Sequence, residues 1–208
     1  MEHSDGTVTF VAATALEYKA LRRALPRSRI VHGGIALARS GAMLGDVVVS
    51  FGLAGGLRTD VGTGTVLIPR EVRCPDGTLR SCDPELVESF ASSARRLGIE
   101  PLFDPLLTSE NIVCGAARAH WASQGYAAAD METGLICASR LAAVRVVLDT
   151  PLREISGDWQ SPLRAMLKPW NWPQAFWLMR EAPRAVARAA AVVAGAEARG
   201  GAAASRCV

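Results

Sequence analysis

Residues 145–149 read Arg-Val-Val-Leu-Asp, an apolar run that ends in a carboxylate. Such a run predicts a buried strand, and an aspartate at the carboxyl end of a strand in an α/β sheet faces the crevice where these folds bind ligands. Asp149 is therefore the first candidate for chemistry. The alternative is that Asp149 only opens the turn at Thr150 and Pro151, which is a common use of aspartate.

The tetrapeptide Asp-Met-Glu-Thr at 130–133 places further carboxylates shortly before this strand. It predicts a short helix over 131–141, with Asp130 as its N-cap and Glu132 near the positive end of the helix dipole. Acidic residues then stand on either side of the helix, as they would around a site. Spacing alone does not separate the structural role from the functional one.

Residues 47–57 read Val-Val-Val-Ser-Phe-Gly-Leu-Ala-Gly-Gly-Leu, a β-branched run that passes directly into a glycine-rich segment. Backbone amides in such a segment can approach an anion or a sugar closely because no Cβ stands in the way. The segment lacks the Gly-Lys-Ser/Thr of a Walker motif and the Gly-x-Gly-x-x-Gly dinucleotide fingerprint. A binding loop and a tight turn between strands both remain open at this point.

The alternation of strand and helix patterns predicts an α/β fold, a mixed twisted sheet flanked by helices on both faces. One domain is expected over residues 1–193, in which 150–193 form a divergent aromatic and basic segment. The Gly/Ala-rich tail at 194–208 is expected to be disordered. Strands are expected near 7–13, 35–39, 46–52, 65–70, 102–108, 126–129 and 143–149, and helices near 15–25, 84–97, 116–123 and 131–141.

Composition suits one small enzyme, since the chain has 208 residues and half of them are apolar. A net charge of +3 is too small for the electrostatic footprint of a nucleic-acid-binding protein. No metal site is expected, because His3, His32 and His120 are isolated from one another and from cysteine at ligand spacing. Five cysteines without a Cys-x-x-Cys motif, and no signal peptide, indicate reduced thiols in the cytoplasm.

Several short segments together carry a family resemblance. In order they are Val-Thr-Phe-Val-Ala-Ala at 8–13, Thr-Ala-Leu-Glu-Tyr-Lys-Ala-Leu at 14–21, Gly-Leu-Ala-Gly-Gly at 52–56, Gly-Thr-Val at 64–66, Asp-Met-Glu at 130–132 and Arg-x-x-x-Asp at 145–149. This series resembles the purine and uridine phosphorylase superfamily, in particular its methylthioadenosine/S-adenosylhomocysteine nucleosidases, over about the first 150 residues. The resemblance implies cleavage of the N-glycosidic bond of a purine nucleoside by a homodimer that needs no cofactor.

The resemblance also implies roles for individual residues. Glu132 would accept hydrogen bonds from the ribose hydroxyls, Met131 would lie against the sugar, and Asp149 would protonate N7 of the departing purine. Ile112 and Val113 would stack on the base and bond to it through the backbone, although a short core strand would explain them equally well. The glycine-rich segment contributes Leu53, Ala54 and Gly55 as further candidate substrate-binding residues.

The nucleophile is left open by two departures from the family pattern. Leu16 stands where the nucleosidases carry the glutamate that activates water, and Glu17, one position later, is expected to be an exposed helix carboxylate, because one residue turns a side chain by about 100°. Ser50 and Leu53 stand where phosphate-binding relatives use an arginine and a hydroxyl residue. Phosphate, as a co-substrate, would need the amides near Gly52 and an arginine from elsewhere, for which Arg39, Arg58 and Arg70 are candidates.

The carboxy-terminal run Leu-Lys-Pro-Trp-Asn-Trp-Pro-Gln-Ala-Phe-Trp-Leu at 167–178 replaces the usual ending. In overall length and in this ending, the chain resembles the hopanoid-associated phosphorylases. That resemblance implies adenine release from adenosylhopane. The aromatic residues would then accept a lipid tail at the inner face of the membrane, or they pack a terminal helix onto the domain. Ordinary methylthioadenosine/S-adenosylhomocysteine cleavage and a non-catalytic nucleoside-binding protein are the alternative functions.

Overall fold

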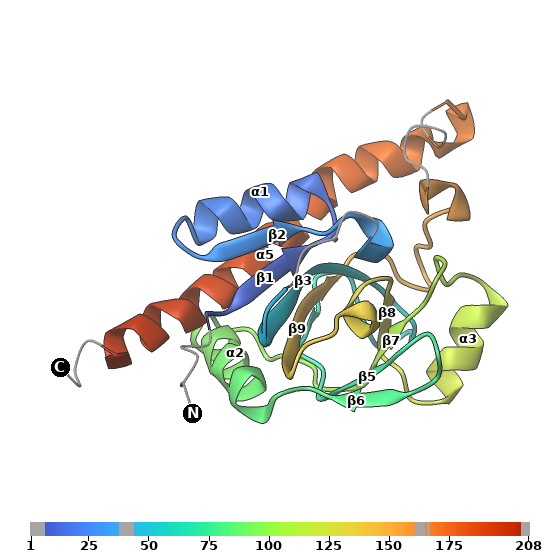
Figure 1. Ribbon diagram of the computed structural model, residues 1–208. Helices are drawn as coiled ribbons and strands as arrows, with labels where there is room; N and C mark the ends of the chain where they lie inside the picture. The colour runs from blue at the N-terminus through green and yellow to red at the C-terminus, as the bar shows by residue number, and fades with distance from the viewer. Residues whose placement is uncertain (1–6, 38–43, 161–164, 166, 205–208) are drawn as a thin grey trace.

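The computed structural model describes residues 7–37, 44–160, 165 and 167–204 (Figure 1). Nine strands form one mixed sheet, and the fold class expected from the sequence is confirmed. The strands are β1 (Thr9–Ala12), β2 (Arg29–His32), β3 (Val47–Gly56), β4 (Val66–Leu67), β5 (Glu71–Arg73), β6 (Leu79–Ser81), β7 (Leu106–Thr108), β8 (Ala128–Asp130) and β9 (Arg140–Val147). The α-helices are α1 (Ala15–Ala24), α2 (Pro84–Arg96), α3 (Ala116–Ser123) and α5 (Trp172–Ala204), and the 3-10 turns are η1 (Ile35–Leu37), η2 (Thr133–Leu135), η3 (Gly157–Gln160) and η4 (Pro169–Asn171).

Strand β3 joins the two halves of the sheet. Its first eight residues, 47–54, run parallel to β9 on one side, and β1 lies parallel on the other side with β2 beyond it. Its last two residues, Gly55 and Gly56, pair antiparallel with β8, which leads through β7 and β5 to β6. The glycine-rich segment is therefore the end of a long central strand. The carboxyl ends of β1, β3, β8 and β9 meet around it.

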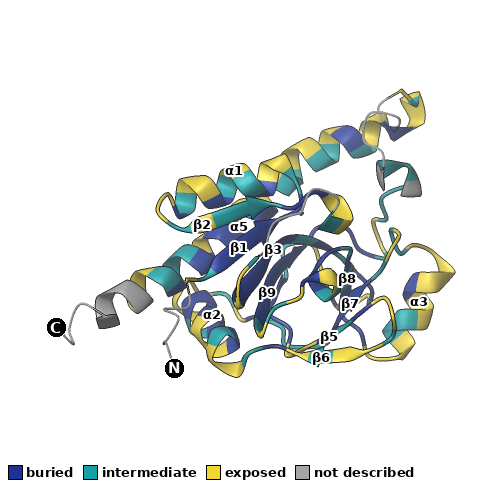
Figure 2. Cartoon of the chain, viewed as in Figure 1, coloured by how far each residue is buried: buried dark blue, intermediate teal, exposed yellow. Residues whose placement is uncertain are grey.

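Helices α1, α2 and α5 cover one face of β1, β3 and β9, where the main core lies (Figure 2). Phe10 and Phe51 are completely buried there, and Val186 and Val193 of α5 pack against the same cluster. Burying each such side chain contributes about 1.5–3 kcal/mol. The opposite face packs against Ile136, which follows η2, and against Leu37, the last residue of η1. Helix α3 packs by Trp121 onto a third cluster.

The predicted helix over 131–141 is wrong. Only the 3-10 turn η2 forms, and strand β9 already begins at Arg140. The reason is tertiary, because Gly134 is wedged between the backbone of Cys74 and the side chain of Thr108, where a Cβ would lie only 2.9 Å from Cys74 Cα. Pairing of 140–147 with β3 then takes the residues that would have formed the last turns of a helix.

Three other segments of the chain differ from the expectation. The predicted strand at 35–39 is the turn η1 up to Leu37, with Ala36 at a φ of 51°, and its last two residues lie outside the described part of the chain. The strand beside β1 is instead β2, which lies earlier in the sequence. No strand was expected at β5 or β6, which form a hairpin closed by a turn in which the Cys74 N–H donates to the carbonyl of Thr78 over 2.8 Å.

The carboxy-terminal segment is helical for longer than expected. Helix α5 continues to Ala204, so the expectation of disorder does not hold for residues 194–204, while 205–208 lie outside the described residues. Val192, Val193 and Ala196 are buried against the domain, which explains why an alanine-rich sequence stays helical here. Within the described residues, none of the helices is both long enough and apolar enough to cross a bilayer.

Candidate functional site

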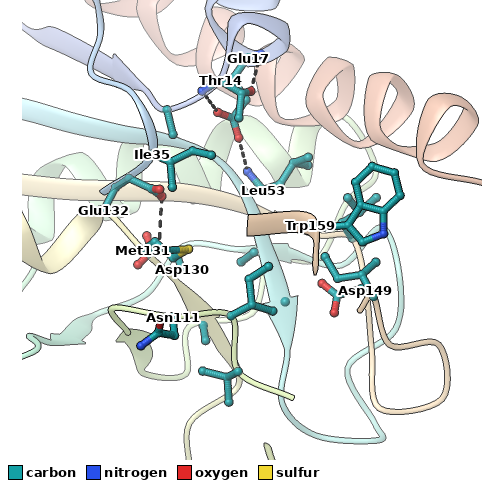
Figure 3. Close-up of a pocket in the computed structure, with 18 of the residues that line it drawn as sticks. Thr14, Glu17, Ile35, Leu53, Asn111, Asp130, Met131, Glu132, Asp149 and Trp159 are labelled. Atoms are coloured by element: carbon teal, nitrogen blue, oxygen red, sulfur yellow. Dashed lines mark hydrogen bonds between the residues drawn. The ribbon is translucent and has the colours of Figure 1, made fainter. Parts of the chain in front are cut away.

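A cavity of about 220 Å³ opens where the carboxyl ends of β1, β3, β8 and β9 meet (Figure 3). Most of its wall is apolar, and its polar groups are mainly carboxylates, the usual composition of a small-molecule site. The lining residues are Ala13, Thr14, Glu17, Ile35, Leu53, Ala54, Gly55, Asn111, Ile112, Val113, Arg118, Ala129, Asp130, Met131, Glu132, Leu148, Asp149, Ile155 and Trp159.

Nine of the residues proposed from sequence line this one cavity. They are Glu17, Leu53, Ala54, Gly55, Ile112, Val113, Met131, Glu132 and Asp149. Gly52 lies directly behind Glu17. The arginine candidates for phosphate do not line the cavity, because Arg58 pairs with Asp60 at 3.0 Å and Asp104 at 2.7 Å, and Arg70 stacks over the ring of Phe103. Arg39 lies outside the described residues.

Glu17 is buried in the cavity wall, so the expectation of an exposed helix carboxylate is wrong. Thr14 caps α1, and Glu17 closes a capping box by accepting the Thr14 N–H at 2.8 Å through Oε2. Its other oxygen, Oε1, accepts the Leu53 N–H at 2.9 Å. Leu16 points outward and is 38% exposed, whereas Glu17 is 2% exposed. The first turn of α1 lies against the glycine-rich segment of β3, and the hydrogen bond from Leu53 holds Glu17 inward.

Gly52 makes that approach feasible. A Cβ at this position would lie 2.2 Å from Glu17 Oε1 and 2.8 Å from Arg145 Nη1, and the residue has a φ of 153°. Both conditions favour glycine. The sequence feature that suggested an anion-binding loop therefore serves here to seat a carboxylate and a guanidinium of the protein itself.

Arg145 is fully buried beside the cavity and binds the acidic residues of 130–132. Its Nη2 lies 2.6 Å from Asp130 Oδ2 and 3.5 Å from Glu132 Oε2, and it donates to Ser50 Oγ at 2.6 Å. Desolvation lowers the pKa of Arg145, but the surrounding carboxylates outweigh it and raise the pKa above its ordinary value. Ser50 thus serves as a partner of Arg145.

Asp130 and Glu132 have different surroundings. Asp130 accepts hydrogen bonds from the Thr108 hydroxyl at 2.7 Å and the Thr133 N–H at 3.2 Å, so it supports the turn. Glu132 faces the cavity and accepts the N–H of Ala36 at 3.3 Å, from a residue 96 positions away. Burial raises its pKa to about 7, the nearby guanidinium of Arg145 opposes this shift, and the carboxylates of Asp130 and Glu17 add to it. Only the 3-10 turn η2 follows, and the Glu132 side chain makes no capping hydrogen bond to it.

Asp149 lies two residues beyond the end of β9 and is buried at the opposite side of the cavity from Glu132 (Figure 3). Its backbone carbonyl accepts the Gly56 N–H at 2.8 Å, which fixes it against the end of β3. Its side chain accepts a hydrogen bond from Arg118 Nη2 of helix α3. Burial raises the pKa of the Asp149 carboxyl, and the contact with Arg118 acts against that shift.

Solved structures of nucleosidases resemble this chain along nearly its whole length. MTAN (5′-methylthioadenosine/S-adenosylhomocysteine nucleosidase) of Helicobacter pylori, solved as a mutant with 5′-methylthioadenosine in the active site, has a TM-score of 0.72 and 10% identity, covering 93% of this chain and 99% of its own. The 5′-methylthioadenosine/S-adenosylhomocysteine nucleosidase from Neisseria meningitidis in complex with methylthio-immucillin-A has a TM-score of 0.68 and 19% identity, covering 92% and 98%. Futalosine hydrolase of Helicobacter pylori has a TM-score of 0.70 and 10% identity, covering 95% and 100%.

The chain has the nucleosidase fold. No protein-family model and no curated protein sequence matches it. The solved structures share only 10–19% of their residues with this chain, so the likeness shows the fold. It confirms the architecture that the sequence resemblance implied.

Within this nucleosidase fold, the cavity has groups that sequence reasoning missed. Arg118 stands alone among small residues in the first turns of α3, and nothing in its spacing connects it to Asp149. Trp159 of η3 forms part of the wall, and its indole N–H donates to Gln174 Oε1 at 2.9 Å. Ile112 and Val113 lie in the loop before α3, so the alternative of a core strand is wrong. A lone arginine in an alanine-rich helix was the one available signal.

The arrangement divides the cavity by chemistry. Carboxylates of Glu17 and Glu132 lie at the end where α1 meets β3, and Asp149 lies at the end where β9 stops. Apolar residues make up most of the rest of the wall, and Ile112 and Val113 are among them. Such a cavity can hold a flat apolar base beside Asp149 and a polyhydroxyl group beside Glu132.

Proposed function

We propose that this protein cleaves the N-glycosidic bond of a purine nucleoside and releases adenine. The observation that carries the proposal is the placement of Asp149 and Glu132, two buried carboxyl groups, on opposite sides of one cavity whose wall is mostly apolar. A nucleoside has the matching order of groups, with a base at one end and ribose hydroxyls at the other. The nucleosidase fold supports the same assignment.

The reaction needs a proton at the base and an acceptor at the sugar. As the C–N bond breaks, its electron pair moves to the base and positive charge grows on the ribose, so both groups lower the barrier. Asp149 donates its proton to N7, and burial of this carboxyl favours the protonated form that the step requires. Glu132 accepts hydrogen bonds from the ribose hydroxyls. Met131 lies against the sugar beside it.

We further propose that water, activated by Glu17, is the nucleophile. The two arginines beside the cavity within the described residues are already engaged, Arg145 by Asp130 and Glu132, and Arg118 by Asp149 and Glu154. A phosphate dianion near Glu17 would meet the negative charges of Glu17 and Glu132, and the guanidinium beside them, that of Arg145, is already paired with protein carboxylates. A water molecule fits this surrounding, because a carboxylate can take its proton.

The substrate we propose is an adenosine with an apolar group on its 5′ carbon. Ile35, Leu53 and Trp159 give the cavity apolar walls, and Trp159 connects through Gln174 to the aromatic start of α5. Methylthioadenosine and adenosylhopane both belong to this class. A lipid tail would extend over Trp170 and Phe176, which are exposed, and would bring the protein to a membrane face.

The test is adenine release by the purified protein from methylthioadenosine and from adenosines with longer apolar 5′ groups. Hydrolysis gives the free sugar whether or not phosphate is present, whereas phosphorolysis gives a sugar 1-phosphate and requires phosphate. Asp149→Asn is expected to lower turnover about 100- to 10,000-fold with little loss of nucleoside binding, because a positioned proton donor is lost. Tight nucleoside binding without any adenine release by the parent protein would identify a binding protein instead.

A further inference from the structure

Arg118 is a buried arginine whose side chain contacts the base end of the cavity. Its side chain is 2% exposed and reaches Asp149 from helix α3, 31 residues earlier in the chain. Its Nη1 donates to the carbonyl of Gly56 at the end of β3. Its Nε lies 3.1 Å from Glu154 Oε1 in the segment after β9. The guanidinium therefore joins three separate elements at Asp149.

The contact leaves the second oxygen of Asp149 on the side of Gly55. Arg118 binds Oδ2, and Oδ1 lies where a Cβ on Gly55 would approach it to 3.0 Å. Gly55 itself lines the cavity. Oδ1 is thus the oxygen nearer to the glycine wall along which a base would lie, while Oδ2 is held by Arg118.

We propose that Arg118 is the positioning residue of Asp149: it fixes the carboxyl so that Oδ1 faces the purine, and its charge lowers the pH at which Asp149 loses its proton. The inference rests on the proposed function. In the step itself, the proton leaves Oδ1 for N7 while the C–N electron pair moves to the base. Asp149 becomes a carboxylate, and its new negative charge lies against the guanidinium.

Two charged groups act on Asp149 in opposite senses. Arg118, from α3, favours the ionised carboxyl, and Glu154, on the far side of the guanidinium, partly offsets that positive charge. Glu154 is also held by the N–H of Gly115 at 2.9 Å, at the start of α3. Among the described residues, these two are the charged side chains that contact Asp149 directly or through one intermediate. Each can be changed separately.

The experiment measures kcat and kcat/KM for adenine release against pH in the parent protein and three variants. Activity requires protonated Asp149, so it is lost as pH rises through the point where Asp149 ionises. Arg118→Met removes the positive charge and should move this alkaline limb upward by about 1–3 pH units. Glu154→Gln keeps the shape but leaves Arg118 less compensated, so the limb should move downward. Arg118→Lys keeps the charge, so the limb should stay, with kcat lowered about 10- to 100-fold because the forked contact with Gly56 is lost.

The control is Arg95→Met, which removes the same charge from a half-exposed arginine paired with Glu88 and Glu100 on the far side of the domain. It should leave the limb in place. If Arg118→Met does not fold, the inference is tested by the other two variants. It requires the alkaline limb to move downward in Glu154→Gln and to stay in place in Arg118→Lys. If the alkaline limb lies at the same pH in the parent, Arg118→Met and Glu154→Gln proteins, the role of Arg118 is overturned, while the proposed function stands. A parent protein that releases no adenine overturns the proposed function, and the inference with it.

Discussion

At the scale of single residues, the site is a small volume in which several carboxyl groups lie close together. Glu17, Asp130 and Glu132 surround one guanidinium, that of Arg145. One positive charge cannot fully compensate three negative ones, and burial removes the water that would screen them. Within this cluster, burial and the neighbouring carboxylates raise the pKa of Glu132 to about 7, against the opposing effect of Arg145.

This raised pKa predicts a pH-dependent stability. The ordinary pKa of the carboxyl is 4.5, so below that pH the folded and unfolded chains are both protonated at Glu132 and its contribution to stability is fully present. Between 4.5 and about 7 the unfolded chain releases the proton while the folded protein holds it, and the contribution is lost as pH rises. The total is roughly 3 kcal/mol of unfolding free energy.

Glu132→Gln, which stays neutral at every pH, provides the comparison. Urea denaturation at pH 5 and pH 8 should show the parent protein losing stability relative to the variant as pH rises. Because other groups titrate in both proteins, the difference between the two is the measured quantity. An equal dependence on pH in parent and variant would mean that Glu132 ionises normally in the folded protein.

At the scale of elements, β3 determines the geometry of the site. It lies between β1 and β9 along most of its length and then crosses to β8 at Gly55. At that crossing the first turn of α1, the turn after β8 and the segment after β9 lie around one cavity. Gly52, just before the crossing, is where a Glu17 carboxylate and the Arg145 guanidinium approach the backbone most closely.

Gly52→Ala should therefore impair the site without removing any functional group. A methyl group would overlap Glu17 Oε1, so Glu17 and Arg145 must both shift, and adenine release should fall at least about 10-fold. Gly62→Ala is the matched control, because a Cβ at Gly62 meets nothing within 4 Å and its φ is not in the positive region. Comparable activity in the two variants would show that the close approach at Gly52 has no functional weight.

At the scale of the whole molecule, the long helix α5 connects the aromatic ending to the core and to the site. Its later turns pack on β3, β9, α1 and α2. At its start, Trp177 is half-buried against the core and lies under the guanidinium of Arg153, 4.5 Å from ring centroid to Cζ. Phe176, the preceding residue, is 70% exposed. Core packing and an exposed apolar surface are thus both present, at adjacent positions.

Adjacent substitutions separate those two roles. Trp177→Ser should lower the melting temperature and reduce activity on every substrate alike, because it removes packed surface. Phe176→Ser should leave the melting temperature unchanged and reduce turnover only for adenosines with long apolar 5′ groups. Each buried methylene contributes about 0.8 kcal/mol, so even partial cover of a tail gives a measurable preference. Leu79→Ser, at a 58% exposed position on β6, controls for loss of surface apolarity. A Phe176→Ser protein with the parent's preference for long groups would exclude a tail site there.

The sequence by itself determined the α/β class, the helices α1, α2 and α3, the approximate places of β1, β3, β4, β7, β8 and β9, and the candidate Asp149. Apolar runs such as 47–51 and 144–148 form strands wherever they are buried, and Asp83 before Pro84 starts α2 by local capping. These signals depend on neighbours within one turn or one strand. Six candidate residues, Leu53, Ala54, Gly55, Met131, Glu132 and Asp149, reached one cavity because strands that end in polar or glycine-rich segments place those ends on one edge of the sheet.

Tertiary structure alone decided which carboxylates face inward and what they touch. The inward turn of Glu17 depends on a contact with Leu53, and the ion pair of Asp149 depends on an arginine from another element. The helix expected after Asp130 gave way because the backbone around Gly134 is wedged against β7 and Cys74, and because β9 pairs with β3. Local propensities are worth tenths of a kcal/mol per residue, whereas burial and pairing across the sheet are worth several, so long-range packing prevails at these positions.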